Sequence, residues 1–359
     1  MGRSGPGPRA LPAALLALAV LLGAACGPSA AAGDASGGRT AGGAAPAAAP
    51  GQPPPLEKVR VALAADSAMY APFFIAMDKG YFADEGLELV TVTLPGGPGT
   101  TALLAGEIDY GTSAGSAASA MLKGAPIKVV YTNADRPGFD IWSTSPELTS
   151  LADLPGKTLG IQSRGDTTDL AARMVFQQRG IDPASVNYVA IGGGAQRLAA
   201  MQAASTDAVV LGVADVVRLQ ELGTRGQQLA NLRAEVQMLY MGVVTSDREL
   251  QEHRDRAKRF LRASIKGREY FKAFKEDTLA IMAAHNGLPR AANEADYDDA
   301  LRGMTPEASM PVEVQRRDAA IRAQVNEAEQ APPVEAMYDY SLVQEIYQEL
   351  KASGWQPTR

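Results

Sequence analysis

The stretch from Ile161 to Val175, IQSRGDTTDLAARMV, sets small polar residues between an apolar run and an amphipathic helix pattern. Hydroxyl groups and free backbone N–H groups at the start of a helix commonly hold a phosphate or another anion. The candidate groups here belong to Ser163, Gly165, Thr167 and Thr168. Asp166 and Asp169 lie in the same turn and would repel an anion. The turn is therefore a candidate binding site that leaves the charge of its ligand open.

The side chain of Asp166 can be interpreted in two ways, and each implies a different ligand. An aspartate here can cap its own helix, whose positive end partly neutralises the carboxylate, so that an anion could still bind. If the carboxylate points into a cleft instead, the ligand should carry an ammonium or N–H group. Arg164 beside it could clamp an anion or lie in solvent as a loop residue.

Residues suited to catalysis or metal binding are scarce. His253 lies in a charged helical stretch and His285 precedes a helix end, so we expect neither near a binding turn. The histidine, cysteine and acidic residues show no metal-ligand spacing. The GGGAQ segment at 192–196 lacks the glycine spacing and the lysine of nucleotide-binding loops. We therefore expect no catalytic residue, no metal, no cofactor and no enzymatic activity.

The composition is that of a chain long enough to bury a sizeable core. It has 359 residues, 46% of them hydrophobic, and a formal net charge of −6 at pH 7. Length alone favours about two or three domains. The negative charge and the lack of a basic stripe interleaved with aromatic residues argue against nucleic-acid binding.

The N-terminal sequence predicts export and lipid anchoring. Residues 1–25 combine an arginine-containing start, an apolar run and small residues at the end, which is typical of a signal peptide. Cys26, the only cysteine, follows at once, so the segment resembles a bacterial lipobox in which this cysteine is lipidated. The alternative is a plain signal peptide with an incidental cysteine. Residues 26–56 are rich in Ala, Gly and Pro and should form a disordered, lipid-anchored linker.

The rest of the chain predicts an α/β fold with two lobes. From Lys58 the pattern is β-α-β-α-β-α-β, which favours a mostly parallel sheet covered by helices. A shorter α/β pattern restarts after residue 150, and strands at 139–146 and 236–246 fall where the chain would leave and re-enter the first lobe. The sequence after Asp247 is mainly helical and should pack back on the first lobe. The predicted boundaries are 57–142 and 240–359 for the first lobe and 143–239 for the second lobe.

Three motifs occur in a specific order and spacing: APFFIAMDKGYFADEGLELVTVTLPGG, LLAGEIDYGTSAGSAASAMLKGAPIKVV and SLADLPGKTLGIQSRGDTTDLAARMVFQQRGID. Together they resemble the solute-binding proteins of nitrate/sulfonate/taurine/pyrimidine-type ABC importers. The resemblance covers roughly Val59 to Gly354. It implies a type II periplasmic-binding fold, a clam of two mixed α/β sheets joined by two hinge strands with a helical C-terminal region. Such sheets bind ligands beyond the carboxyl ends of their strands, so the cleft between the lobes is the expected site.

The family's pocket turns map onto matching positions of this chain. The ligand-binding residues that the resemblance and the cleft imply are Ser67, Met69, Tyr70, Ser113, Gly115, Ser116, Trp142, Ser163, Gly165, Asp166, Thr167, Thr168, Gly193 and Asp215. Structural alternatives remain open: Ser113 and Ser116 could only cap a helix, Trp142 could belong to the core, and Asp215 could be an ordinary cap. Asp166 stands where the family usually has a hydroxyl residue, which argues against an anionic ligand.

The function expected from the sequence is that of the solute-binding component of an ABC importer. A small polar or organic solute of the sulfonate, nitrate or pyrimidine-like class would be captured between the lobes and delivered to a membrane permease and its ATPase. We expect a monomer, exported and held by Cys26 at the outer face of the cytoplasmic membrane, in the periplasm or at the cell surface. The alternatives are a sensory or partner-presenting lipoprotein of the same fold, and an enzyme like the pyrimidine synthases of thiamin biosynthesis. Those enzymes use a cysteine-rich motif and a reactive histidine, neither of which this chain has.

Overall fold

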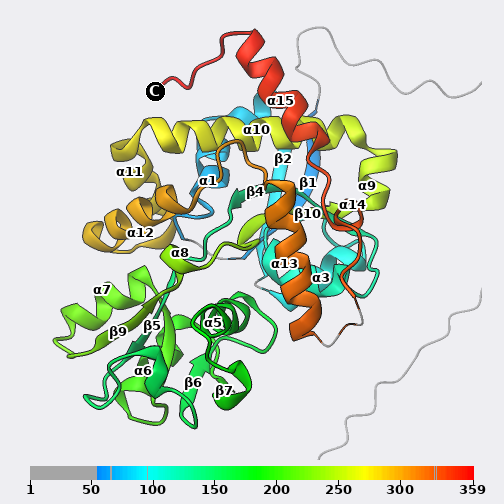
Figure 1. Ribbon diagram of the computed structural model, residues 1–359. Helices are drawn as coiled ribbons and strands as arrows, with labels where there is room; N and C mark the ends of the chain where they lie inside the picture. Colours follow the sequence, from blue (N-terminus) through cyan, green and yellow to red (C-terminus); the bar gives the residue numbers. More distant parts are fainter. Residues whose placement is uncertain (1–54, 65–66, 95, 327, 329) are drawn as a thin grey trace, which may run out of the picture. The chain divides into compact units, whose positions relative to one another are not determined.

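The computed structural model describes residues 55–64, 67–94, 96–326, 328 and 330–359 (Figure 1). The predicted signal peptide 1–25, Cys26 and the predicted linker up to residue 54 lie outside the described residues. No helix in the described ranges is long and apolar enough to cross a membrane.

The first sheet has five strands in the order β2-β1-β3-β10-β4. β1 pairs in parallel with β2 and β3, whereas β10 runs antiparallel to β3 and β4. β4 is buried along nearly its whole length, as expected for a strand covered on both faces. The strands are β1 (Glu57–Leu63), β2 (Leu87–Thr93), β3 (Tyr110–Gly111), β4 (Ile127–Ala134) and β10 (Met241–Ser246), and the helices between the first four are α1 (Ala71–Asp78), α2 (Tyr81–Asp84), α3 (Gly97–Leu104) and α4 (Ala114–Met121).

The second sheet also has five strands, in the order β7-β6-β8-β5-β9. β6 is parallel to β7 and β8, and β5 is antiparallel to β8 and β9. The strands are β5 (Phe139–Ser143), β6 (Thr158–Ile161), β7 (Asn187–Ala190), β8 (Ala208–Gly212) and β9 (Gln227–Asn231). The helices around them are η1 (Leu151–Asp153), α5 (Thr167–Gln178), η2 (Pro183–Ser185), α6 (Gly194–Gln202), α7 (Val213–Glu221) and α8 (Leu232–Glu235). We call the parts built on the two sheets the first lobe and the second lobe.

The two segments predicted to be hinge strands each belong to one of the sheets. β5 is part of the second sheet from Phe139 onward, because Phe139 already pairs with Gly212 of β8. Sheet membership therefore changes at residue 139, before the predicted boundary at 142. The two sheets are connected by the short segments 135–138 and 236–240. The expected architecture of two mixed α/β sheets with a helical C-terminal region is confirmed.

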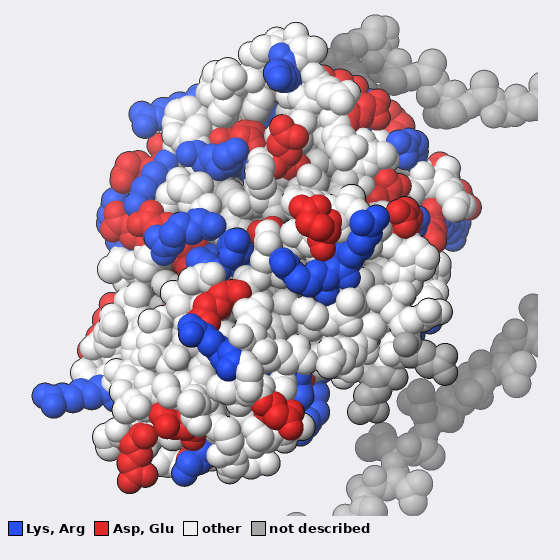
Figure 2. All heavy atoms as spheres, in the orientation of Figure 1, with Lys and Arg blue, Asp and Glu red and all other residues white. Residues whose placement is uncertain are grey.

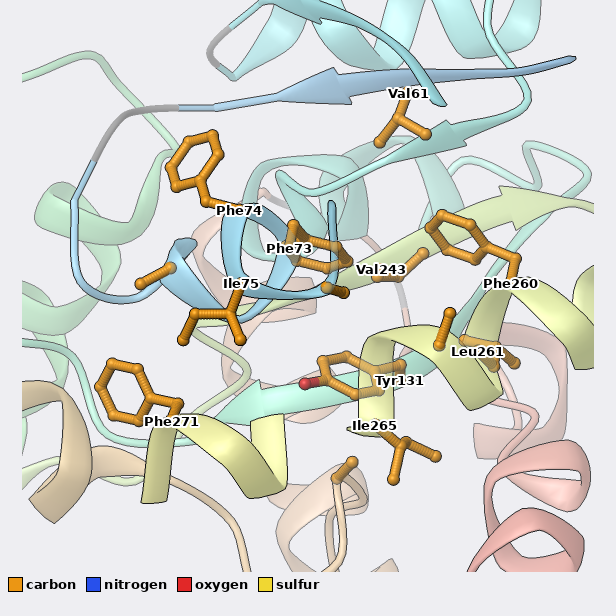
Figure 3. Close-up of a cluster of buried hydrophobic side chains, with 14 of the residues drawn as sticks. Val61, Phe73, Phe74, Ile75, Tyr131, Val243, Phe260, Leu261, Ile265 and Phe271 are labelled. Atoms are coloured by element: carbon orange, nitrogen blue, oxygen red, sulfur yellow. The ribbon is translucent and has the colours of Figure 1, made fainter. Parts of the chain in front are cut away.

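Most of the chain after Asp247 is helical, as predicted, and α10 and α15 pack against the first lobe. Figure 3 shows the core beneath α10, where aromatic side chains from α1, β4 and α10 meet. Phe73 lies between Tyr131 and Phe260, with ring centroids 6.3 and 6.4 Å away. The helices are α9 (Asp247–Glu252), α10 (Arg254–Ala273), α11 (Lys275–Asn286), α12 (Arg290–Gly303), α13 (Val312–Val325), α14 (Val334–Met337) and α15 (Ser341–Ala352).

The exposed side of α10 is charged, and several of its basic residues form ion pairs. Arg262 and Lys266 both contact Glu85, at 2.8 and 2.9 Å, and Lys258 reaches Glu349 at 2.6 Å. On the face drawn in Figure 2, basic and acidic side chains are interspersed and form no stripe of one sign.

Helix α13 packs against the cores of both lobes. Val314 and Ala319 contact the first-lobe cluster around α4, and Ile321 and Val325 pack against the second-lobe core. The same helix carries Arg322, which is only 1% exposed. α13 therefore acts as a third link between the lobes, beside the segments 135–138 and 236–240.

Arg322 ties this helix to the connection between the lobes and to the start of α4 in the first lobe. Its guanidinium donates to the carbonyl oxygens of Gly115 and Leu239, each at 2.7 Å, and to Asp318 Oδ2 at 2.7 Å. Asp318 Oδ1 accepts from the backbone N–H of Leu239 at 3.0 Å, and Tyr338 donates to Oδ2. The buried pair thus satisfies three backbone groups of two separate segments, Gly115 and Leu239.

Replacing Arg322 with methionine should strongly destabilise the protein. Asp318 would remain buried without its cation, and two buried carbonyls would lose their donor, so we expect a loss of about 3–5 kcal/mol in the free energy of unfolding. Chemical denaturation measures this loss. Arg316→Met, at an exposed position of the same helix, is the matched control and should change stability little. Equal effects of the two substitutions would contradict the assigned role of Arg322.

Candidate functional site

A cavity of about 520 Å³ lies between the two lobes. Small-molecule sites typically enclose about 300–1,000 Å³. Its wall is formed largely by the segments that follow β1, β3, β6 and β8, which are strands that pair in parallel within their sheets. The carboxyl ends of parallel strands are the usual location of ligand sites in open α/β sheets.

Ten of the fourteen residues predicted from the sequence line this cavity. They are Ser67, Met69, Tyr70, Ser113, Gly115, Ser116, Asp166, Thr167, Thr168 and Asp215. Four do not: Ser163 is exposed, Gly165 lies in the same turn outside the wall, Gly193 precedes the lining residue Gly194, and Trp142 packs against the core of the second lobe. For Trp142 the structure thus agrees with the core interpretation, because its strand β5 is buried inside the second sheet.

Asp166 caps its helix and also faces the cavity. As the N-cap of α5 it accepts hydrogen bonds from the backbone N–H groups of Thr168 and Asp169, at 3.0 and 3.1 Å, and from the Thr168 hydroxyl at 2.7 Å. All three bonds go to Oδ1, and within the described chain Oδ2 makes no hydrogen bond. Burial raises the pKa of Asp166, although these bonds oppose the shift. The two interpretations of Asp166 are therefore compatible.

Asp215 is a second carboxylate at a helix start of the second lobe. It lies in the first turn of α7, close to the backbone N–H of Gly212, which opposes the rise in its pKa. Its carboxylate also lies against Gly194, the first residue of α6, where an added Cβ would be only 1.9 Å from Oδ2. The glycine is thus required by this close approach. Burial raises the pKa of Asp215.

Arg197 is the lining residue whose positive charge interacts with these two carboxylates. It is 2% exposed and is held by the backbone oxygens of Val210, at 2.6 Å, and Gly192. Burial lowers its pKa, while the charges of Asp215 and Asp166 oppose that shift. We did not expect Arg197 at the site. The sequence did contain a signal for it. A cation in the first turn of a helix interacts unfavourably with the helix dipole, so its presence there suggests a role outside the helix.

The C-terminal helical region adds two further carboxylates that the sequence analysis missed. Asp296 of α12 accepts a hydrogen bond from the backbone N–H of Ala68 at 2.7 Å. Burial raises the pKa of Asp296 to about 6. Asp299, one turn later, pairs with Arg233 of the second lobe and is 6% exposed. Both aspartates line the cavity, but nothing local in their acidic helix distinguishes them from a solvated face.

His285 also lines the cavity, against the prediction that it would lie away from the binding turns. The end of α11 reaches the wall because this helix packs on α1, whose start faces the cavity. The ring stacks on Phe74, with centroids 4.2 Å apart, and Nε2 lies 3.4 Å from Asp78 Oδ2. No cluster of three or more potential metal ligands occurs in the described part of the chain.

Aromatic side chains form the apolar part of the wall. Tyr70 comes from the first lobe, Phe139 from β5, and Tyr240 from the segment that connects the lobes. Phe139 and Tyr240 meet edge to face, with centroids 5.5 Å apart. Burial raises the pKa of Tyr70 and of Tyr240, so both hydroxyls are neutral at physiological pH. Such rings give a flat solute contact area with little loss of side-chain freedom.

The lobes touch across the cavity. A Cβ added to Gly115 of the first lobe would lie 2.7 Å from the hydroxyl oxygen of Thr167 in the second lobe and 2.9 Å from the carbonyl oxygen of Tyr240. The ion pair between Arg233 and Asp299 bridges the lobes at another point of the wall. The lining segments of the two lobes therefore lie close enough to enclose a small molecule.

The raised pKa of Asp296 predicts a pH-dependent contribution to stability. An acid whose pKa is higher in the folded state stabilises the fold fully below its unfolded pKa, here 3.8, and loses that contribution as the pH rises through about 6. Asp296→Asn cannot ionise and keeps an oxygen for the N–H of Ala68. We expect it to be more stable than the parent at pH 7 by about 2 kcal/mol and equally stable near pH 4.

Denaturation curves at pH 4 and pH 7 test this prediction. Asp298→Asn on the same helix is the control, because Asp298 is half exposed and pairs with Lys275 outside the cavity wall. A difference between Asp296→Asn and the parent that does not change with pH would show that the carboxylate of Asp296 is not destabilised by burial.

Residues 67–276 match the protein family described as NMT1/THI5 like. Among curated proteins, the riboflavin-binding protein RibY of Chloroflexus aurantiacus is 28% identical over 229 residues, which cover 60% of this chain and 62% of RibY. The match therefore spans less than two thirds of that relative's length.

Among solved structures, the periplasmic aliphatic sulphonate binding protein SsuA from Escherichia coli superposes with a TM-score of 0.65 at 17% identity, over 86% of this chain and 94% of SsuA. The desulfurization enzyme DSZB superposes with a TM-score of 0.61 at 12% identity, over 82% of this chain and 99% of DSZB. These likenesses establish a shared fold, which serves a binding protein in one case and an enzyme in the other.

Proposed function

The chain belongs to the NMT1/THI5-like family, and we propose that it is the solute-binding component of an ABC importer. The observation that carries this proposal is the cavity between the lobes, which is walled by strand ends of both sheets and is of small-molecule size. A solute that contacts both lobes favours the arrangement in which they touch, because it gains its full set of contacts only there. The permease would recognise that arrangement and accept the solute.

The solute belongs to the class of small polar or organic molecules that relatives of this fold bind. RibY is named for riboflavin and SsuA for aliphatic sulphonates, so a flavin and a sulfonate are the first candidates to test. The aromatic side chains of Tyr70, Phe139 and Tyr240 suit a flat ring.

Export and lipid anchoring at Cys26 complete the proposal. A lipid on this cysteine would hold the binding unit near its permease through the segment that follows. We expect the protein in the membrane fraction of its host, and Cys26→Ala should move it to the soluble exported fraction. Fractionation followed by immunoblotting measures this. A parent protein found only in the soluble fraction would leave a plain signal peptide as the explanation.

We propose that the protein is not an enzyme, although DSZB has the same fold. The described residues that line the cavity include no cysteine, and their one histidine is stacked on Phe74. A sensory lipoprotein of the same fold is the second candidate for the function. It differs from an importer component in the neighbouring genes, since only the importer requires a permease and an ATPase.

Binding should depend on Thr167 but not on Ser163. Thr167 lines the cavity and Ser163 is exposed in the same turn, so Ser163→Ala is a matched control for Thr167→Ala. Loss of one hydrogen-bonding hydroxyl should weaken binding by about 1 kcal/mol, or about fivefold in Kd. A thermal-shift screen identifies a solute and isothermal titration measures Kd.

X-ray scattering with and without that solute tests the proposed closure. We expect compaction in its presence. A binding solute that causes no compaction would contradict the importer mechanism, and equal affinities of both variants and the parent would remove the 163–168 turn from the binding site.

A further inference from the structure

Protein carboxylates already occupy several of the helix starts at which this cavity could have bound an anion. Backbone N–H groups at a helix start are the usual anion site in such a fold. In α5 those of Thr168 and Asp169 donate to Asp166. In the turn before α1 the N–H of Ala68 donates to Asp296.

The carboxylate of Asp215 covers the starts of two helices. It lies close to the backbone of Gly212 ahead of α7 and against Gly194 at the start of α6. Two other helix starts in the described part of this wall have no carboxylate: Ser113 and Ser116 face the cavity at the start of α4, and Gly96, the N-cap of α3, also lines it.

The formal charges at the wall do not cancel. The carboxylates of Asp166, Asp215, Asp296 and Asp299 line the cavity. Arg197 interacts electrostatically with Asp166 and Asp215, and Arg233 pairs with Asp299. Asp296 has no ion-pair partner within the described chain, where its only hydrogen bond comes from Ala68. The wall therefore carries more negative than positive charge.

We infer that the solute carries no net negative charge and donates N–H, O–H or ammonium groups to Asp166, Asp215 and Asp296. This inference rests on the proposed function and narrows its ligand class. An anion would meet like charges in a partly buried site and would find few free N–H groups to replace its hydration. A hydrogen-bond donor would instead find oxygens that are already oriented by the helix starts.

The two lobes present different hydrogen-bonding groups to such a solute. Asp166 and Asp215 present acceptors from the second lobe, while Ser113 and Ser116 can donate from the first lobe. The aromatic rings of Tyr70 and Tyr240 lie in the same wall. These groups fit a flat heterocycle that has hydroxyl or amino donors on one side and a carbonyl or ring-nitrogen acceptor on the other.

Pairs of probes that differ in charge test the inference. The full chain, purified in detergent, is screened by thermal shift and titrated calorimetrically with riboflavin and riboflavin 5′-phosphate, thiamine and thiamine monophosphate, and benzylamine and benzenesulfonate. We expect the binders to be the members without the phosphate or sulfonate, with Kd at least 100-fold lower than that of the anionic counterpart. Tighter or equal binding of an anionic member would overturn the inference and leave the proposed function intact.

Substitution at the carboxylates tests their role directly. Asp166→Asn combined with Asp215→Asn keeps side-chain oxygens at both helix starts and leaves Arg197 facing the cavity without its two anionic neighbours. We expect the ratio of the Kd of the anionic probe to that of its counterpart to fall below tenfold. Asp182→Asn, at the exposed cap of η2 in the same lobe, is the control and should leave this ratio unchanged. An unchanged ratio in the double variant would show that Asp166 and Asp215 do not cause the discrimination.

If no probe binds, the result contradicts the proposed function for these solute classes. The inference about the charge of the solute, which rests on that function, is then contradicted as well. A folded control is available from the same samples, because thermal unfolding of each variant reports whether the lobes remain intact.

Discussion

Strand ends and helix starts leave backbone groups without partners, and in this protein those groups meet at one cavity. A buried N–H or C=O must find a partner, or the fold loses stability. The chain supplies partners from distant segments: Asp296 binds the N–H of Ala68, and Arg322 binds the carbonyls of Gly115 and Leu239. Asp166 and Asp296 bind such backbone groups and also line the cavity wall, where they add to its negative charge.

The same constraint determines how the lobes can move. The segments 135–138 and 236–240 are short, and α13 packs on both lobes beside them. Arg322 holds α13 to Leu239 in one of these segments and to Gly115 at the start of α4. The closing motion that the proposed function requires must therefore either preserve this buried contact or break it.

Local sequence patterns could locate the parts of the site that follow strands. Ser113 and Asp166 each stand where an apolar run gives way to a helix, and both line the cavity. Asp296 and Asp299 could not be found in this way, because only the docking of α12 brings them to the wall. Phe139 was placed in the wrong part of the fold, since strand propensity does not reveal which sheet a strand joins. The fold itself could be predicted from the sequence, because alternating strand and helix patterns allow few arrangements.

The shared fold does not determine what the cavity holds. SsuA and DSZB superpose on this chain, although one is a sulphonate-binding protein and the other an enzyme. What the cavity of this chain binds must therefore be argued from the groups at its own helix starts. A hydroxyl at a helix start leaves some N–H groups to a ligand, whereas the carboxylate of Asp166 takes two of them and adds a charge. A change of a few atoms at the start of α5 can therefore reverse the preferred charge of the solute while the strands and helices stay in place.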